Sequence, residues 1–395
     1  MNQSTKIAVI NPSAHMGGAE ISLLELVGRL KNRYEFHILL PDDGPLRERA
    51  EGLGAHVSIV PWPEAITRTG ERGKKIKIAR LARAAIISPR LIFSLSRRLQ
   101  EINASVWITN GIKCHILASL VPRDRHISLI WYLRDGLEGR KISSRLLSMV
   151  SFRCDAAICI SRYIAQELRK TVSDSLPHDV LYNIVNLERF QPGLPLPVDL
   201  RKEPEEIWFG IVGAITRLKG QDLFLEAAAK VSGIVPGARF LIVGGNLYAT
   251  EQKSEFEEML KGMVLGTPLR DKVRFLGYRT DVPSIVANFD VLVQSNRGPE
   301  GLGRSVLEAM ACSVPVIAVD RWGPKELIQD GITGLLFPPG NTESLAQKMV
   351  DLAQHPDRRE YLGENARKWV HANLLPDNLA AGFRKIIDRA MSDAL

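Results

Sequence analysis

Two glutamates stand at a spacing suited to ligand binding in PEGLGRSVLEAMA, residues 299–311. Glu300 follows the apolar run 290–294, and a Gly-Leu-Gly sequence separates it from a helical pattern that carries Glu308. Glycines let a backbone approach a ligand closely, and the N–H groups at the start of a helix attract phosphate. The two carboxylates could then accept hydrogen bonds from sugar and ribose hydroxyls. Either glutamate alone is more often a solvated side chain, so the prediction depends on the combination.

Two cations stand in the loop of GIVGAITRLKGQD, residues 210–222. Arg217 and Lys219 follow an apolar run that ends at Gly213. Arginine can bind a diphosphate through two N–H groups, and lysine binds it as a point charge. The loop therefore predicts a site for a pyrophosphate. The alternative is a solvated basic loop, since runs of charge are usually exposed.

A glycine pair, Gly17 and Gly18, follows the first apolar run in the sequence MGGAE. It permits a tight turn from strand to helix with its backbone open to a ligand. The alternative is a turn with no binding role. The pair is not part of a GxGxxG pattern, and no GxxxxGK[ST] loop occurs, so neither a dinucleotide site nor a P-loop is indicated.

Short apolar runs alternate with helical periodicity along the whole chain. This alternation is typical of a parallel sheet covered by helices on both faces, with ligands bound at the carboxyl ends of the strands. The predicted strands are 6–10, 36–40, 56–60, 105–109, 127–133, 156–160, 179–183, 207–212, 239–243, 272–276, 290–294, 314–319 and 334–337.

A break in this pattern at 191–206 contains four prolines, which cannot extend a helix or a central strand. We therefore predict two doubly wound α/β domains in series. The N-terminal domain would cover 1–190, the linker 191–206 and the C-terminal domain 207–375. Residues 376–395 would form a helix that packs back on the N-terminal domain.

The composition is that of an ordinary globular chain, with 395 residues, 45% hydrophobic and 24% charged. The four cysteines form no CxxC pair, so neither a disulfide framework nor a structural zinc site is expected. We therefore expect a reducing, cytoplasmic location. No apolar run is long enough to span a membrane, and no secretory signal is expected. The net charge of +8 favours anionic partners.

Part of this charge lies in the stretch 67–100, where ten Lys or Arg accompany a single acid, Glu71. Basic side chains interleaved with apolar ones can lie in an anionic membrane interface, here the inner face of the membrane. The alternative is a pair of helices that pack on the core with solvated basic faces. Phe93 is the only aromatic residue of the stretch, so nucleic acid is not an expected partner.

These motifs together resemble the retaining GT-B glycosyltransferases of the glycosyl transferase group 1 type, often called family 4, over nearly the whole chain. Glu300-x7-Glu308 is similar to the E-x7-E motif of that family, and 309–341 to the stretch after it. MGGAE resembles its N-terminal glycine loop, and DVLYNIVNLERFQP its strand before the interdomain linker. Lys219 stands at the position of its donor-phosphate lysine.

The resemblance implies two facing Rossmann-like domains with a cleft between them, and transfer of a sugar from a nucleotide sugar with retained anomeric configuration. Arg217 and Lys219 would neutralise the leaving diphosphate, Glu300 would hold the donor sugar, and Glu308 the ribose. The implied catalytic residues are Glu300, Lys219, Arg217 and Asp135. The implied donor-binding residues are Gly17, Gly18, Gly213, Gly277, Tyr278, Gly301, Leu302, Gly303 and Glu308.

Some positions depart from the family pattern. Ala214 stands where most members have arginine, and Arg217 is expected to supply the lost charge. Arg134-Asp135 replaces a common His-Asp pair, so Asp135 could accept a hydrogen bond from an attacking hydroxyl and Arg134 could bind an anionic acceptor. A surface ion pair between these two is the alternative. His15 is a further candidate for acceptor contact, and Ser313 replaces a common glycine in a turn.

The expected enzyme is thus a hexosyltransferase that acts on a saccharide or lipid-linked acceptor in polysaccharide or cell-envelope glycan synthesis. No DxD sequence occurs in the chain, so we expect neither a metal nor another cofactor, and a UDP- or GDP-sugar as co-substrate. A nucleotide-sugar epimerase or hydrolase on the same fold is one alternative. A non-catalytic nucleotide-sugar-binding protein is the other.

Overall fold

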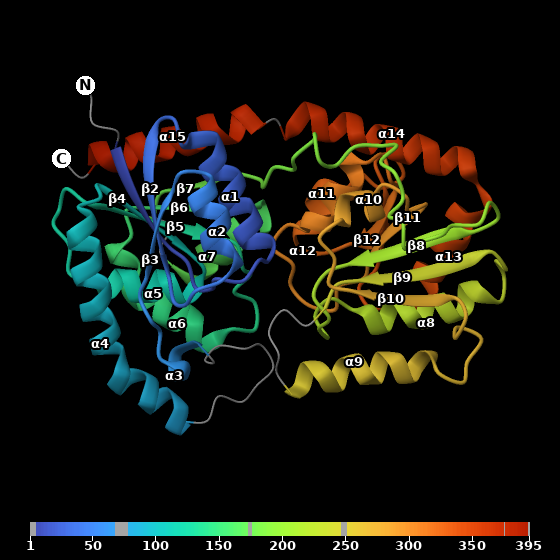
Figure 1. Ribbon diagram of the computed structural model, residues 1–395, viewed down its shortest axis with the longest axis horizontal. Helices are drawn as coiled ribbons and strands as arrows, with labels where there is room; N and C mark the ends of the chain where they lie inside the picture. Colours follow the sequence, from blue (N-terminus) through green and yellow to red (C-terminus); the bar gives the residue numbers. More distant parts are fainter. Residues whose placement is uncertain (1–4, 68–77, 173–175, 246–250, 375, 394–395) are drawn as a thin grey trace. The chain divides into compact units, whose positions relative to one another are not determined.

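The computed structural model describes residues 5–67, 78–172, 176–245, 251–374 and 376–393. The chain divides into two compact units, each with its own parallel sheet (Figure 1). The first unit contains Met1–Asn183 and Pro376–Leu395, and the second contains Ile184–Leu375. The C-terminal helix thus belongs to the first unit, although it follows the second in sequence.

The first unit is built on a seven-stranded parallel sheet in the order β3-β2-β1-β4-β5-β6-β7. All six residues of β5 are buried, as expected for a central parallel strand covered on both faces. The strands are β1 Thr5–Ile10, β2 Tyr34–Leu40, β3 His56–Ile59, β4 Val106–Asn110, β5 Ser128–Leu133, β6 Ala156–Cys159 and β7 His178–Val180.

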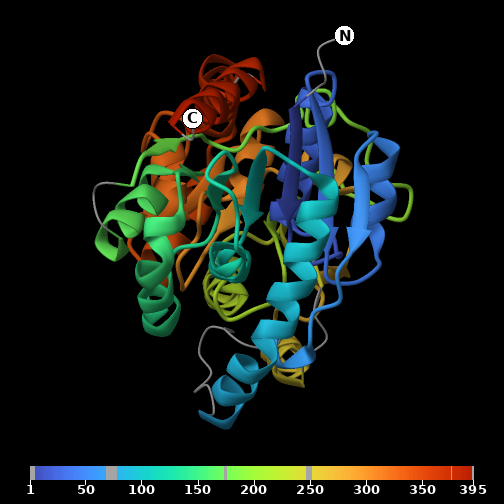
Figure 2. The ribbon, with the colours of Figure 1, turned by 90° about the vertical axis from the view of Figure 1, so that its left-hand side faces the viewer.

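Helices cover both faces of this sheet, because right-handed crossovers toward β3 and toward β7 place their helices on opposite sides. On one face α15 packs against α1 and β5. On the other face α4, the long light-blue helix in Figure 2, contacts α5, which contacts α6, which contacts α7. The helices are α1 Gly18–Leu30, α2 Pro45–Gly52, α3 Glu64–Thr67, α4 Ile78–Ile102, α5 Ile112–Leu120, α6 Lys141–Val150, α7 Arg162–Thr171 and α15 Pro376–Asp393, with a 3-10 turn η1 Ser151–Arg153.

The second unit repeats this architecture with a six-stranded parallel sheet in the order β10-β9-β8-β11-β12-β13. Its strands are β8 Ile207–Val212, β9 Ala238–Val243, β10 Val273–Gly277, β11 Val291–Gln294, β12 Val316–Val319 and β13 Leu335–Phe337. Its helices are α8 Gln221–Ser232, α9 Glu251–Val264, α10 Val282–Val286, α11 Arg304–Ala311, α12 Trp322–Leu327, α13 Thr342–Gln354 and α14 Pro356–Asn373.

The predicted fold class is confirmed, since each predicted strand overlaps a strand of one of two doubly wound sheets. The division between the units lies at Asn183/Ile184, whereas the linker was expected at 191–206. The proline-rich segment is attached to the second unit by side chains. Lys202 lies 2.6 Å from Asp290, and Arg279 lies 2.6 Å from Asp199. It therefore packs as part of that unit's surface.

The basic stretch 67–100 ends in α4. Residues 68–77 and the side chains of 78–88 lie outside the described residues. In the remainder of the helix Leu91, Leu95 and Leu99 are buried in the core, so this apolar face is not available to a membrane. Arg97 and Arg98 pair with Glu101, at 3.0 and 2.7 Å. Over the described part of the chain, no helix combines the length and the hydropathy needed to cross a bilayer.

Candidate functional site

The acidic and basic loops of the second unit meet at the carboxyl ends of its strands. Lys219 Nζ donates a hydrogen bond of 2.5 Å to Glu300 Oε2, and Asn296 Nδ2 donates to the same oxygen at 3.0 Å. The Lys219 side chain is 33% exposed and that of Glu300 is 17% exposed. Two side chains 81 positions apart thus form one ion pair that solvent can reach.

Backbone contacts between the two loops hold this pair in place. The N–H groups of Arg297 and Gly298 both donate to the Leu218 carbonyl, at 3.0 and 3.2 Å. Gly220 is in the left-handed region at φ 71°, and a Cβ there would lie 1.9 Å from the Ser295 carbonyl oxygen. Only glycine fits both requirements. The loops after β8 and β11 are therefore clamped together at the residues beside the ion pair.

Glycines also line the neighbouring strand ends. Gly213 directly follows β8 at φ 152°, and a Cβ built on it would contact the Lys219 side chain at 3.6 Å. Gly244 follows β9 and donates its N–H to the Gly277 carbonyl at the end of β10, at 2.8 Å. Gly277 at φ 66° and the following Tyr278 are exposed. A ligand can therefore approach the backbone at three adjacent strand ends.

The second glutamate of the motif lies on α11, which Gly303 precedes at φ 98°. Glu308 Oε1 accepts a hydrogen bond of 2.7 Å from Arg304 Nε one turn earlier, and both side chains are largely buried. Gly301 and Leu302 are also buried, and a Cβ built on Gly323 would lie 2.3 Å from the carbonyl oxygen of Gly301. The loop of the motif, which follows β11, thus packs against the start of α12.

Arg217, in contrast, is directed toward α9. Its guanidinium carbon lies 5.1 Å from the centre of the Phe256 ring, and its Nη2 lies 3.9 Å from Met259 Sδ. Ala214 contributes only its backbone carbonyl, which accepts from Gln221 Nε2 at 3.0 Å. In this conformation the charge of Arg217 is held against an aromatic ring of α9, and the ion pair at the strand ends is made by Lys219.

The first unit carries a different kind of site at the carboxyl ends of its strands. Arg134 is only 8% exposed and follows β5 directly. Its Nε donates to Asn110 Oδ1 at 2.5 Å, and its Nη1 donates to Asn183 Oδ1 at 3.0 Å. The guanidinium carbon lies 4.0 Å from the centre of the Tyr132 ring. Among the described residues its buried Nη2 finds no hydrogen-bond partner.

This network continues to the glycine loop. Asn110 Nδ2 donates to Asn11 Oδ1 at 2.6 Å, and Asn11 Nδ2 lies 3.4 Å from Glu20 Oε1. Glu20 Oε2 in turn accepts the Gly17 N–H at 3.1 Å and caps α1. Burial raises the pKa of Glu20, although Asn11, Arg134 and the Gly17 N–H act in the opposite direction.

Sequence reasoning missed Asn11, Glu20, Asn110 and Asn183. A signal for three of them is present, because each asparagine directly follows an apolar run or ends it. Carboxyl ends of parallel strands meet at one edge, so polar residues in that position lie together.

The other candidates of this unit are more exposed. Asp135 is exposed, and its Oδ1 lies 3.9 Å from Arg140 Nη2, whereas Arg134 is buried and bonded to Asn110 and Asn183. His15 is exposed in the glycine loop, where its N–H donates to Ser13 Oγ at 3.0 Å, and Gly18 is exposed at the start of α1. Ser313 adopts φ 59°, the left-handed conformation that favours glycine.

Two family models match the two halves of the chain. The model described as Glycosyltransferase Family 4 matches residues 16–189, and that described as Glycosyl transferases group 1 matches residues 196–369. An uncharacterized glycosyltransferase of Methanocaldococcus jannaschii is 26% identical over 391 residues, which are 96% of this chain and 97% of the relative. A GDP-mannose-dependent phosphatidylinositol monomannoside mannosyltransferase of Mycobacterium tuberculosis is 30% identical over 251 residues, 61% of this chain and 63% of the relative.

Solved structures show the same fold at low identity. Anabaena HepE, in complex with UDP and glucose, superposes with a TM-score of 0.80 at 18% identity, covering 97% of this chain and 99% of HepE. Sucrose-phosphate synthase of Thermosynechococcus elongatus gives 0.77 at 18% identity, covering 98% and 100%. Two parallel α/β units, an ion-paired glutamate motif at the strand ends and matching family models over both halves lead to one assignment: the chain is a GT-B glycosyltransferase of the group 1, family 4 type.

Proposed function

We propose that this glycosyltransferase moves a hexose from a UDP- or GDP-sugar to a hydroxyl of a saccharide or glycolipid, with retained anomeric configuration and without a metal. The pathway would be polysaccharide or cell-envelope glycan synthesis. The observation that carries the proposal is the 2.5 Å pair of Lys219 with Glu300 beside glycine-lined strand ends.

The donor diphosphate would lie against Lys219. An ammonium group has three N–H donors, and the bond to Glu300 uses one of them. Negative charge grows on the diphosphate as the glycosidic bond breaks, and a cation already in place stabilises it without reorganisation. This is the role that a divalent ion has in sites with a metal-binding carboxylate motif, and the chain has no DxD sequence.

The two glutamates would select and orient the donor. Glu300 would accept hydrogen bonds from hydroxyls of the sugar, and Glu308 from those of the ribose. The backbone at Gly277 and Tyr278 would hold the base. The phosphates and the sugar would be held by Gly213 and residues 301–303. The resemblance implies attack from the face of the leaving phosphate, so no protein nucleophile is needed.

The first unit would supply the acceptor site, and its glycine loop, Gly17 and Gly18, would contribute to binding of the donor. Arg134 supports this role, because its buried Nη2 lacks a partner among the described residues and could bind an anionic acceptor group. Asp135 is exposed and could accept the proton of the attacking hydroxyl. His15 would lie at the edge of this site.

The first unit could also contact an anionic membrane. The basic residues of 67–100 motivate this proposal. The exposed apolar side chains that could enter a membrane interface lie on α6 and η1, where Met149 is 70% and Phe152 83% exposed. Residues 140–153 contain four basic and no acidic residues. We expect Met149→Ser with Phe152→Ser to weaken cosedimentation with anionic vesicles, and Tyr361→Ser on α14 to leave it unchanged. Equal binding of all three proteins would refute this contact.

A donor panel tests the proposal directly. Ligands that bind the folded state raise its unfolding temperature, so UDP-, GDP-, ADP- and dTDP-sugars can be compared by thermal shift. The named relative uses GDP-mannose and HepE was solved with UDP, so these two bases are tested first. The reaction with a saccharide acceptor is then run with and without EDTA. NMR of the product reports its anomeric configuration.

The possible outcomes separate the alternatives. Transfer with retention and no effect of EDTA supports the proposal. An inverted product, or activity abolished by EDTA and restored by a metal ion, contradicts retention or metal independence. Donor turnover without an acceptor would indicate the epimerase or hydrolase, and donor binding without any turnover would indicate a binding protein.

A further inference from the structure

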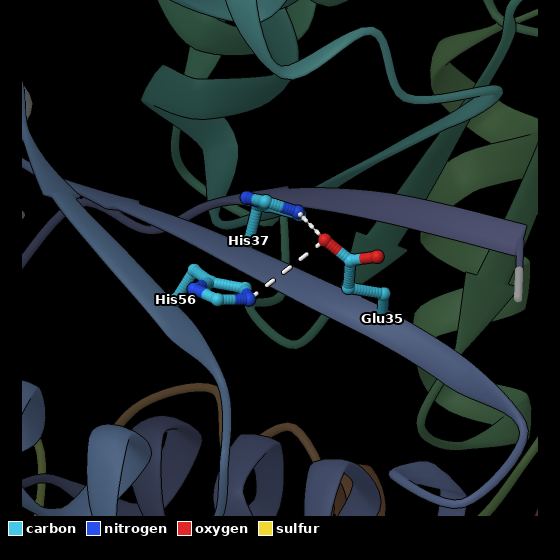
Figure 3. A group of neighbouring side chains, drawn as sticks. All are labelled: Glu35, His37 and His56. Carbon is cyan, nitrogen blue, oxygen red and sulfur yellow. Dashed lines mark hydrogen bonds and ion pairs between the residues drawn. The ribbon is translucent and has the colours of Figure 1, made fainter.

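Three side chains of types that ligate metals lie close together on β3, at one edge of the first sheet, and on its neighbour β2 (Figure 3). Glu35 and His37 alternate on β2 and so point to the same face, and His56 is the direct register partner of His37 on β3. Figure 3 shows a nitrogen of each imidazole directed at the same carboxylate oxygen. We propose that Glu35, His37 and His56 bind a divalent transition-metal ion such as Zn²⁺.

The distances fit a shared ion after small side-chain rotations. Glu35 Oε1 lies 2.7 Å from His37 Nε2 and 3.7 Å from His56 Nε2, and one ligand atom of each residue lies within 4.8 Å of the others. With zinc–ligand bonds of about 2.0–2.2 Å, two ligands of a tetrahedral ion are roughly 3.4 Å apart. The two observed distances lie on either side of that value, and no two of the three ligand atoms are more than 4.8 Å apart, so side-chain rotations would bring them toward this spacing.

The donor set has the right chemistry. Two histidines and one carboxylate are the protein ligands of zinc sites that leave a further position for water. The two rings are already stacked, with centroids 4.8 Å apart and planes at 23°, which limits their rotational freedom before binding.

An ion can reach the site from solvent. His37 and His56 line a cavity of about 380 Å³ together with Lys6, Arg98, Glu51 and Glu101. The two carboxylates of the cavity offset the two cations. The His56 side chain is 63% exposed, so the entry path is open on the β3 side.

The position separates this site from sugar transfer. Glu35 is the second residue of β2, and His56 is the first of β3, so both lie near the amino ends of their strands. Asn110 and Arg134 lie at the carboxyl ends of β4 and β5. The ion would therefore tie the edge strand β3 to β2 and stabilise the sheet edge, and it would take no part in the reaction.

Metal titration of the untagged, metal-free protein tests the proposal. We expect Co²⁺ to bind with one equivalent and give the visible absorption of a tetrahedral complex, and Zn²⁺ to displace it. His56→Ala and Glu35→Gln should each weaken Co²⁺ and Zn²⁺ binding at least tenfold. Both side chains are partly exposed, so the fold should survive. His126→Ala, which removes an exposed histidine outside the group, is the matched control.

Thermal unfolding gives a second measurement. Zn²⁺ should raise the midpoint of the parent protein and of His126→Ala more than that of the two cluster variants, since only binding to the folded state stabilises it. Binding of less than one equivalent, or equal affinity in the parent and His56→Ala, would overturn the proposal. Transferase activity is then compared between the metal-free parent and metal-free His56→Ala. A loss of activity in His56→Ala would overturn the separation of the metal site from the reaction.

Discussion

The two units present polar groups at the same edge of similar sheets but hold them differently. In the second unit a partly exposed ion pair, Lys219 with Glu300, lies between loops clamped by backbone contacts. In the first unit Arg134 is buried in a network of asparagine side chains. A solvent-accessible ion pair costs little to rearrange, whereas a buried charge depends on each of its partners. We therefore expect substitutions in the second unit to affect turnover, and those in the first to affect stability as well.

The largest expected effect is that of Lys219→Ala. Removal of one preplaced group that stabilises developing negative charge typically costs about a hundredfold to a thousandfold in turnover. The side chain is partly exposed, so we expect the unfolding midpoint to change little. Steady-state kinetics with the preferred donor measures the loss.

Lys230→Ala is the control for this prediction, since Lys230 forms an exposed lysine–glutamate pair with Glu343 at 2.8 Å in the same unit. Its turnover should match that of the parent. Normal turnover of Lys219→Ala would disprove the placement of the diphosphate.

A smaller effect, on the free energy of unfolding, is expected for Arg134→Ala. The change leaves the buried oxygens of Asn110 and Asn183 without their donor, and one such loss costs about 1–3 kcal/mol. Urea denaturation should therefore show a destabilisation of about 3 kcal/mol. Arg134→Lys should recover only part of it, because lysine cannot reproduce the two-pronged geometry.

Arg217→Ala is the matched substitution in the second unit, to be compared with Arg134→Ala. Arg217 is exposed and its guanidinium lies against the Phe256 ring of α9, so we expect less than about 0.5 kcal/mol of destabilisation. If the two alanine variants lost equal stability, the contrast between the units would be wrong.

The smallest effect concerns the pH dependence contributed by Glu20. Burial raises its pKa in the folded state above the 4.5 of the unfolded chain, so between these values the folded state binds more protons. The stability from this residue is complete below pH 4.5 and is lost as the pH rises through the folded-state pKa. The loss is about 1.4 kcal/mol for each unit of the shift.

Glu20→Gln isolates this contribution, because glutamine stays neutral. Urea denaturation from pH 4.5 upward should show the parent losing free energy of unfolding relative to the variant as the pH rises. Above the folded-state pKa of Glu20, the difference between the two proteins should become constant. A difference that is independent of pH, or of opposite sign, would contradict the raised pKa.

Much of the fold could be predicted, because buried parallel strands are short apolar runs and their ends are marked by glycine and polar residues. The motif residues Glu300, Glu308 and Lys219 could also be singled out. The role of Arg217 as a replacement for the arginine missing at Ala214 could not be judged, since its contact with Phe256 depends on where α9 packs. The division between the units also lies earlier in the chain than the predicted linker. Ion pairs hold the proline-rich segment on the second unit, and these contacts depend on the folded chain.

The two α/β units, their strands and the motif that identifies the family can be recognised in the sequence, because they depend on local periodicity and spacing. Which distant side chains meet is known from the folded chain alone. The fold brought Lys219 to Glu300, joined Asn110 and Asn183 to Arg134, and placed His56 beside His37. The physical reason is that strand order and register, which no local pattern encodes, set the distances between residues far apart in the chain.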